Sequence, residues 1–208
     1  MREIIIVQHC QSEHHVNNLT GGWTDTPLTD LGYRQAEATA KRIAFLTTNK
    51  EFVLYSSDLL RAKQTAEIIS YKLGIKITFS KQLREINNGV AVGKTKEWAN
   101  EHRNVTSGES FSIDYREFDK GESWREFYNR ICNFMKIVLE KDEEQILIVS
   151  HGCAIGYIIA WWMQFTPLML EQNCFQSKPG SISILKKNKY KQHSIILFND
   201  TCHLIDCE

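Results

Sequence analysis

The sequence shows no excess of charge of either sign, because 25 lysines and arginines balance 25 aspartates and glutamates. A chain with this balance lacks the strongly basic surface that attracts nucleic acids or anionic membranes. We therefore expect no nucleic acid partner and no membrane partner. Internal repeats, low-complexity tracts and linkers are also missing. With 208 residues, 42% of them hydrophobic, the sequence predicts a single domain over residues 1–208.

The sequence also lacks paired cysteines and long apolar runs. Its six cysteines include no CxxC spacing, and the chain is too large to need disulfide bonds for stability, so we interpret them as reduced thiols. No apolar window approaches the ~20 residues of a membrane span, and the apolar run before Gln8 is too short for a signal peptide core. These features predict a cytoplasmic protein, and nothing in them indicates an oligomeric state.

The N-terminal stretch combines a buried strand with a polar turn. Residues 4–7 are apolar and rich in β-branched side chains, which is typical of a strand buried on both faces of a parallel sheet. Polar residues begin directly afterwards, at Gln8 and His9. Open α/β sheets bind their ligands at the carboxyl ends of the strands, so His9 is the candidate reactive group. The alternative is a histidine that merely ends a strand.

Strands and helices alternate along the rest of the chain, and this predicts an α/β fold: a three-layer sandwich with a mostly parallel central sheet flanked by helices. We expect Thr29 to cap a helix, Ser56 to Asp58 to cap another, and Gly74 to end that second helix. The expected helices cover residues 30–46, 59–73, 94–103, 124–138 and 152–163; the expected strands cover residues 4–7, 52–55, 75–79 and 145–149, followed by an antiparallel pair at 182–185 and 193–198.

Two regions between these elements bear on function. The irregular loop 83–93 crosses the edge of the sheet, and the polar segment from Asn104 to Lys120 is of the kind that covers a site, so we expect substrate specificity there. The helix that follows presents an apolar side that includes Phe127, Ile131 and Ile137. Glu122 and Arg130 are interpreted as an ion pair near its surface.

His9 and His151 each follow a run of apolar, β-branched residues and open a loop. If these two strands are neighbours in the sheet, both imidazoles lie in one crevice at its carboxyl edge. Arg61 falls in the first turn of the helix after the second strand, and Glu85 lies in the loop after the third. Such a pocket suits phosphoryl transfer: the cation holds the oxygens, one imidazole attacks phosphorus, and the acid protonates the leaving oxygen.

The chain resembles the histidine phosphatase superfamily, which includes phosphoglycerate mutase-like enzymes and small phosphatases. The resemblance is carried by ordered motifs along the whole chain, at residues 8–12, at 22–29 with Gly32, Gln35 and Ala36, at 56–66, at 83–87 with Gly89 and Gly93, at 121–123 with Arg130, at 149–152 and at 199–204. It implies His9 as the nucleophile that becomes phosphohistidine and Glu85 as the proton donor. His151 and Arg61 are expected to hold the phosphoryl group.

The resemblance further implies a phosphomonoester hydrolase for a small phosphorylated metabolite, with no metal and no organic cofactor. Gln8, Ser12 and His15 are additional candidates for phosphate binding. Two alternatives stay open, namely a phosphoglycerate mutase-type phosphotransferase and a non-catalytic protein that binds phosphate esters. A metal site built from His9, His14, His15 and Glu13 is disfavoured, because adjacent residues such as His14 and His15 are expected to face different ways.

Four positions depart from the pattern of the family. Gln8 stands where the family has arginine, Cys10 where it has glycine, Gln11 where it has glutamate, and His15 where asparagine is frequent. Loss of a charged donor costs on the order of 10² to 10³ in rate. A protonated His15 could restore part of the charge below about pH 6.5. Cys10 is expected to displace the loop if its position requires a positive φ.

Overall fold

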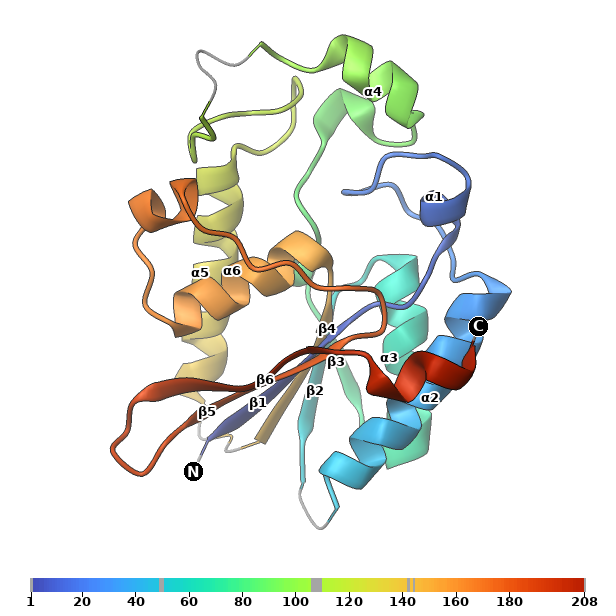
Figure 1. The fold of residues 1–208 in the computed structure, drawn as a ribbon, viewed down its shortest axis with the longest axis vertical. Coiled ribbons are helices and arrows are strands. Elements are labelled where there is room, and N and C mark those ends of the chain that lie inside the picture. The colour runs from blue at the N-terminus through green and yellow to red at the C-terminus, as the bar shows by residue number, and fades with distance from the viewer. Residues whose placement is uncertain (1, 49–50, 106–109, 142, 144, 208) are drawn as a thin grey trace.

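Six strands form one mixed sheet in the computed structural model, which describes residues 2–48, 51–105, 110–141, 143 and 145–207 (Figure 1). The order across the sheet is β3-β2-β4-β1-β5-β6. The strands are β1 (Glu3–Gln8), β2 (Val53–Ser56), β3 (Ile77–Phe79), β4 (Gln145–Ser150), β5 (Ile182–Lys187) and β6 (His193–Asp200). Only β5 runs against the direction of its five companions, which confirms the predicted mostly parallel sheet and the terminal antiparallel pair.

The register of β1 decides where the functional side chains lie. β1 pairs in parallel with β4, with Gln8 opposite Ser150, so His9 and His151 leave the sheet side by side at its carboxyl edge. All six residues of β1 are buried, as expected for a strand covered on both faces. The predicted neighbourhood of the two histidine-bearing strands is therefore confirmed.

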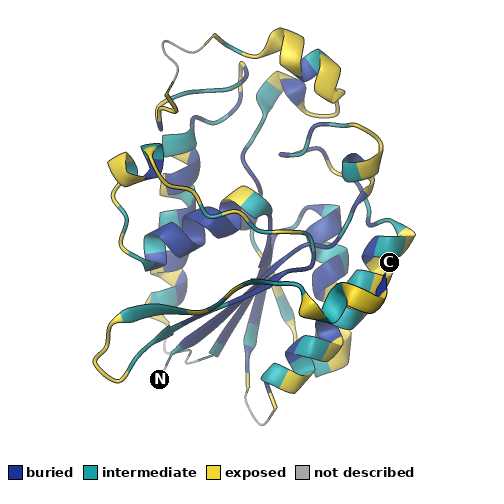
Figure 2. Cartoon of the chain, viewed as in Figure 1, coloured by how far each residue is buried: buried dark blue, intermediate teal, exposed yellow. Residues whose placement is uncertain are grey.

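Helices cover both faces of the sheet, so the three-layer architecture is confirmed. The helices are α1 (Glu13–Val16), α2 (Asp30–Leu46), α3 (Leu60–Leu73), α4 (Lys96–His102), α5 (Trp124–Glu140) and α6 (Gly152–Trp162), with short 3₁₀ turns at Lys81–Leu83, Gly89–Ala91, Pro167–Glu171 and Cys202–Cys207. Helices α5 and α6 pack on one face and α2 and α3 on the other, each over its own apolar cluster. Figure 2 shows β1, β4 and α6 among the most deeply buried elements, whereas β3 and β6 at the two edges of the sheet are more exposed.

Local signals set most helix ends. Thr29 caps α2, since its Oγ1 accepts a hydrogen bond of 3.0 Å from the Gly32 N–H. Gly74 ends α3 at a φ of +68°, a left-handed conformation that glycine adopts at little cost. Both predictions are confirmed.

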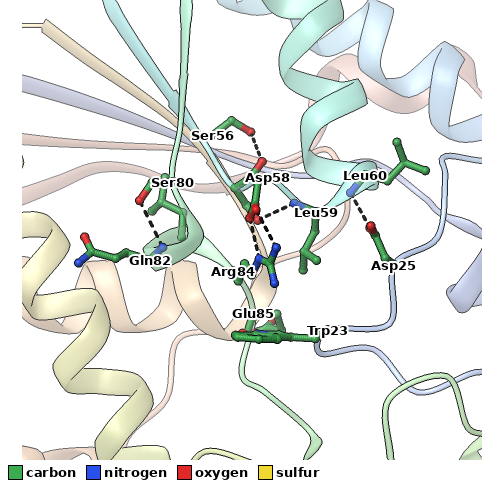
Figure 3. A network of polar contacts seen from close by, with 12 residues as sticks. Trp23, Asp25, Ser56, Asp58, Leu59, Leu60, Ser80, Gln82, Arg84 and Glu85 are labelled. Atoms are coloured by element: carbon green, nitrogen blue, oxygen red, sulfur yellow. Dashed lines mark hydrogen bonds and ion pairs between the residues drawn. The ribbon is translucent and has the colours of Figure 1, made fainter.

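The predicted cap of α3 is wrong. The N-cap residue is Leu59, which offers no side-chain acceptor, and the exposed Leu60 N–H is bound instead by the Asp25 carboxylate at 2.6 Å. The Asp58 carboxylate instead forms a bidentate ion pair with the Arg84 guanidinium, with both N–O distances at 2.7 Å (Figure 3). The helix end is therefore satisfied by a residue 35 positions earlier in the chain, which no local pattern reveals.

Helix α5 begins with a capping box between Ser123 and Glu126 and buries Phe127 and Ile131 against the sheet. Ile137 was expected on the same side, but 51% of it is exposed, so that assignment is wrong. Ile137 lies three residues after Phe134 and falls outside the apolar stripe, because only part of the helix surface faces the sheet.

The six cysteines are all unpaired in the structure, as the absence of CxxC spacing indicated. Within the residues described above, none of the helices has the length and apolar character that crossing a membrane requires.

Candidate active site

A cavity of about 680 Å³ opens at the carboxyl edge of the sheet. Gln8 and His9 at the end of β1, Arg61 in the first turn of α3 and Glu85 in the loop after β3 all line it. These segments are far apart in the sequence and meet here because parallel strands end at the same edge. The predicted convergence of His9, Arg61 and Glu85 on one crevice is therefore present in the fold.

His9 is fixed in one orientation by both of its ring nitrogens. Nδ1 lies 2.8 Å from the Cys10 carbonyl oxygen, which makes it the donor, and Nε2 accepts a hydrogen bond of 3.1 Å from Arg61 Nε. Burial lowers the pKa of His9 well below its usual 6.5, and the nearby Arg61 charge lowers it further. His9 is thus neutral at physiological pH, with an unprotonated Nε2 as a nucleophile requires.

Arg61 is 1% exposed and is anchored by the backbone of the loop before α2. Its Nη1 donates to the Thr24 carbonyl and its Nη2 to the Gly22 carbonyl, each at 2.7 Å. Burial lowers its pKa to about 10, an effect that the Glu85 carboxyl opposes, so the guanidinium stays charged at neutral pH. Its remaining N–H hydrogens are suited to an anion in the cavity.

Gly22 carries the carbonyl that Arg61 uses and has a φ of +57°. A Cβ at this position would lie 2.0 Å from Asn88 Oδ1. A side chain would therefore strain the backbone and collide with the neighbouring loop. The anchoring of the guanidinium depends on this glycine.

His151 lies beside His9, with 5.0 Å between the ring centroids. Its Nε2 is 2.8 Å from the Ser57 hydroxyl, while its Nδ1 is buried and has no hydrogen-bond partner among the described residues. Burial lowers the pKa of His151 well below its usual value, and Arg61 lowers it further. A buried polar atom without a partner is costly, so an unsatisfied nitrogen here fits a ligand oxygen as its partner.

Glu85 is nearly fully buried, and its carboxyl group accepts hydrogen bonds of 3.0 Å from the Ile86 N–H and the Cys153 N–H. Burial raises its pKa above the usual 4.5, although those two N–H groups and Arg61 act in the opposite direction. The net effect favours the protonated acid, which is the form that can give a proton to a leaving group.

The backbone around Glu85 is clamped from two sides. Trp23 Nε1 and Arg130 Nη2 both donate to the Glu85 carbonyl, at 2.8 Å and 3.0 Å. The Arg84 guanidinium lies over the Trp23 ring, 4.7 Å from its centroid, while it holds Asp58 (Figure 3). The loop that carries the acid is therefore rigidly supported.

Arg130 does pair with Glu122, at 2.7 Å, as the sequence indicated. Its Nη1 also donates to the carbonyls of Gln82 and Arg84. Arg130 therefore supports the loop that bears Glu85, in addition to forming an ion pair at the helix surface. Sequence reasoning missed this role, because the partners are backbone atoms almost 50 residues away.

The further phosphate candidates are placed differently. Gln8 lines the cavity, and its Oε1 accepts a hydrogen bond of 2.6 Å from the Ser177 hydroxyl, which leaves its amide N–H groups for an anion. His15 also lines the cavity. Ser12 is fully buried and is not one of the lining residues; its hydroxyl lies 2.8 Å from His14 Nδ1.

Two expectations about the neighbouring histidines are wrong. The rings of His14 and His15 lie together, with 4.0 Å between centroids, because the short helix α1 lets both turn toward Ser12. The pKa of His15 is lowered to about 4, first by burial and then by the charges of Arg61 and Lys96. His15 is therefore neutral near pH 6.5 and does not replace a lost positive charge there.

Cys10 does not strain the loop that follows β1. It is not among the described residues with a positive φ, and its thiol is buried in a small cluster with Leu28 and Ala36. Burial raises the pKa of this thiol to about 12, so it is an unreactive group.

We predict a bell-shaped pH profile for a poor leaving group. If His9 is the nucleophile, it must be neutral to attack, and because its pKa is lowered, the acid limb lies well below pH 6.5. If Glu85 is the proton donor, it must be protonated, and because its pKa is raised, activity falls as pH rises through a value above 4.5. The check is kcat/KM for an alkyl phosphate across the pH range. An acid limb at or above pH 6.5 would contradict the assignment of a neutral, buried His9.

The profile of the histidine phosphatase superfamily (branch 1) matches residues 4–201 of this chain. A curated relative from Citrobacter koseri named "Probable phosphoglycerate mutase GpmB" is 32% identical over 166 residues, which cover 77% of this chain and 74% of the relative.

Solved structures of other proteins share the fold. The α-ribazole phosphatase from Shigella flexneri superimposes with a TM-score of 0.78 at 21% identity, covering 95% of this chain and 96% of that one. A mycobacterial glucosyl-3-phosphoglycerate phosphatase gives a TM-score of 0.80 at 20% identity, covering 97% and 100%. At these identities the similarity establishes the architecture and not the substrate.

Proposed function

The chain belongs to the histidine phosphatase superfamily, and on that premise we propose that it is a phosphomonoester hydrolase acting on a small phosphorylated metabolite through phosphohistidine at His9. The observation that carries this proposal is the arrangement around His9. Its unprotonated Nε2 is held at 3.1 Å by the Arg61 guanidinium, in a cavity that also contains the buried acid Glu85. A nucleophile, an anion-binding cation and a proton donor in one cavity are what hydrolysis of a phosphate ester requires.

In the first step, the Arg61 Nε–H that bonds His9 Nε2 turns to a nonbridging oxygen, the freed Nε2 lone pair attacks phosphorus, and the bond from phosphorus to the ester oxygen breaks. Glu85 gives its proton to that oxygen, and the alcohol leaves. Arg61 and His151 hold the nonbridging oxygens as negative charge shifts among them. In the second step, the Glu85 carboxylate takes a proton from water, the water oxygen attacks phosphorus, and the bond to Nε2 breaks. Inorganic phosphate and neutral His9 result.

Two other functions have specific support. A phosphoglycerate mutase activity is favoured by the name of the curated relative, and it would require the phosphoryl group to be returned to an acceptor rather than to water. A non-catalytic binder of phosphate esters is favoured by Gln8, which gives the site an uncharged donor. Arg61, His9 and Glu85 nevertheless line one cavity, and this supports hydrolysis as the better proposal.

The test is rapid quenching of the wild-type protein after mixing with a labelled aryl phosphate. We expect phosphate on the protein that is lost in acid and stable in base, as for phosphohistidine, followed by release of inorganic phosphate. Transfer of the label to added phosphoglycerate in place of release would favour the mutase. Binding of the ester without label on the protein would favour the non-catalytic binder.

We predict that Gln8→Arg raises kcat/KM by about tenfold or more, because it adds a planar, charged donor to the anion site. Since Cys10 does not distort the loop, the single substitution is expected to suffice, without Cys10→Gly. Steady-state hydrolysis of an aryl phosphate measures the effect. Gln8→Lys is the matched control, with the same charge but without the bidentate geometry, and a smaller gain is expected. If the wild type is inactive and both folded variants are inactive too, the hydrolase proposal is wrong and the non-catalytic binder of phosphate esters replaces it.

A further inference from the structure

The cavity is much larger than a phosphate group requires. At about 680 Å³ it falls within the range of pockets that enclose a whole small organic ligand. Its polar end holds His9, Arg61 and Glu85, and the remaining space is lined mainly by the start of α5, by α6 and by residues 170–177. The chemistry of that remaining wall therefore selects the alcohol portion of the ester.

Aromatic side chains form much of this wall. Phe111 meets Trp124 edge to face at 5.6 Å between centroids, and Trp124 meets Tyr157 in the same way at 6.1 Å. Phe175 and Leu170 also line the cavity. A continuous set of rings in edge-to-face contact offers further rings the same favourable geometry.

Segment 104–120, where specificity was expected, contributes Phe111 alone among its described residues, while residues 106–109 of that segment lie outside the described part of the chain. Most of the wall comes instead from α6 and from residues 170–177, the connection toward β5. The expectation that specificity lies in 104–120 stays a prediction, and the fold brings a later connection over the same edge of the sheet.

The wall has little to offer a second negative charge. Arg61 is the only lysine or arginine among the lining residues that the structure describes, and it is committed to the phosphate end. His14 and His15 are neutral at physiological pH, since burial lowers their pKa values to about 3 and about 4. Glu171 adds a carboxyl group. A carboxylate or second phosphate on the substrate would therefore enter without an opposite charge.

The Tyr157 hydroxyl is a buried polar group in the wall of the cavity. Tyr157 is only 8% exposed, and its buried hydroxyl oxygen has no hydrogen-bond partner within the described residues. Burial raises the pKa of this phenol, so it remains protonated and can either donate or accept. Because buried polar groups in proteins are generally satisfied, the hydroxyl points to an uncharged polar atom on the ligand.

We propose, resting on the function proposed above, that the alcohol portion of the substrate is an uncharged group bearing an aromatic or heteroaromatic ring. The ring lies against Phe111, Trp124 and Tyr157, and a polar atom on it pairs with the Tyr157 hydroxyl. Phosphoglycerates and bisphosphates fall outside this class, because each carries a second anionic group into a wall without a free cation.

The test compares three primary alkyl esters: 2-phenylethyl phosphate, glycerol 3-phosphate and 3-phosphoglycerate. All three leaving groups are primary alkoxides and need the same protonation. We expect kcat/KM for phenylethyl phosphate to exceed that for glycerol phosphate by about tenfold or more, as one well-packed aromatic contact allows. Phosphoglycerate is expected to be the poorest of the three.

Two variants locate the preference in this wall. Phe111→Ala, at a residue that is 41% exposed and so removable without loss of the core, is expected to reduce the ratio of the phenylethyl to the glycerol ester by about threefold to tenfold. Phe45→Ala on the outer surface of α2, where the ring is 73% exposed, is the matched control and should leave the ratio unchanged. Tyr157→Phe should lower kcat/KM for hydroxyphenylethyl phosphate more than for phenylethyl phosphate.

The outcomes separate the two proposals. If phosphate is released but phosphoglycerate or glycerol phosphate is preferred, the substrate class is wrong and the phosphatase stands. Equal ratios in wild type and Phe111→Ala would also overturn the assignment of the ring to this wall. If none of the three esters nor an aryl phosphate releases phosphate, the hydrolase itself is wrong, and the substrate class is overturned with it.

Discussion

Replacing His9 by alanine is expected to abolish the labelled phosphoprotein and to reduce kcat by about 10⁴-fold or more, as loss of a covalent nucleophile does. We expect the neighbouring rings of His14, His15 and His151 not to substitute for it. Arg61 Nε is directed at His9 Nε2, and His151 uses one of its nitrogens on the Ser57 hydroxyl. Rapid-quench labelling and steady-state release of phosphate measure the two effects.

His102→Ala is the matched control, because it also removes an imidazole, but from the exposed surface of α4, where the ring stacks on Trp98 at 4.0 Å. We expect labelling and turnover like those of the wild type. His9→Ala must retain a native circular-dichroism spectrum for the comparison to hold. Undiminished labelling in folded His9→Ala would place the nucleophile elsewhere.

Glu85→Gln is expected to slow alkyl phosphates by about 10²-fold to 10⁴-fold while leaving aryl phosphates much less affected. An alkoxide needs a proton as the bond breaks, whereas a phenolate with electron-withdrawing groups leaves without one. The amide cannot supply that proton. The alkaline limb of the pH profile is also expected to disappear, because it reports the loss of the Glu85 proton.

The structure adds one cost to this variant. The Glu85 carboxyl accepts from both the Ile86 N–H and the Cys153 N–H, and an amide can serve only one of them with its oxygen. We expect a loss of about 1 kcal/mol in the free energy of unfolding, a value too small to unfold the chain. The aryl ester measured on the same preparation controls for that loss. Equal slowing of alkyl and aryl esters would remove Glu85 from the role of the acid.

Local sequence alone determined most of the framework. The continuous apolar, β-branched runs that became β1 and β4 are local signals that need no distant partner to be interpreted. Thr29 and Gly74 mark helix ends by the chemistry of their own side chains and backbones. The proximity of His9 and His151 could be predicted because each directly follows a buried strand, and parallel neighbouring strands end at one edge of the sheet.

The support of the reactive groups was decided by the tertiary structure. Asp25 caps α3 from a loop 35 residues away, and Arg130 holds carbonyls of the loop that bears Glu85. The protonation states follow the same rule. His15 has an ordinary sequence context, but burial beside Arg61 and Lys96 is what lowers its pKa and removes the charge that the sequence suggested.

The aromatic wall of the cavity was likewise invisible in the sequence. Four separate segments supply its aromatic residues Phe111, Trp124, Tyr157 and Phe175. In the sequence, each of these residues is equally consistent with an ordinary place in the core. Their position around one cavity depends on how α5, α6 and the connection before β5 cross the edge of the sheet. Propensity and periodicity act over a few neighbouring residues, whereas a cavity is made by long-range packing. The sequence by itself therefore determined which strands bring His9 and His151 to one edge of the sheet, and only the folded arrangement decided which side chains surround the cavity there.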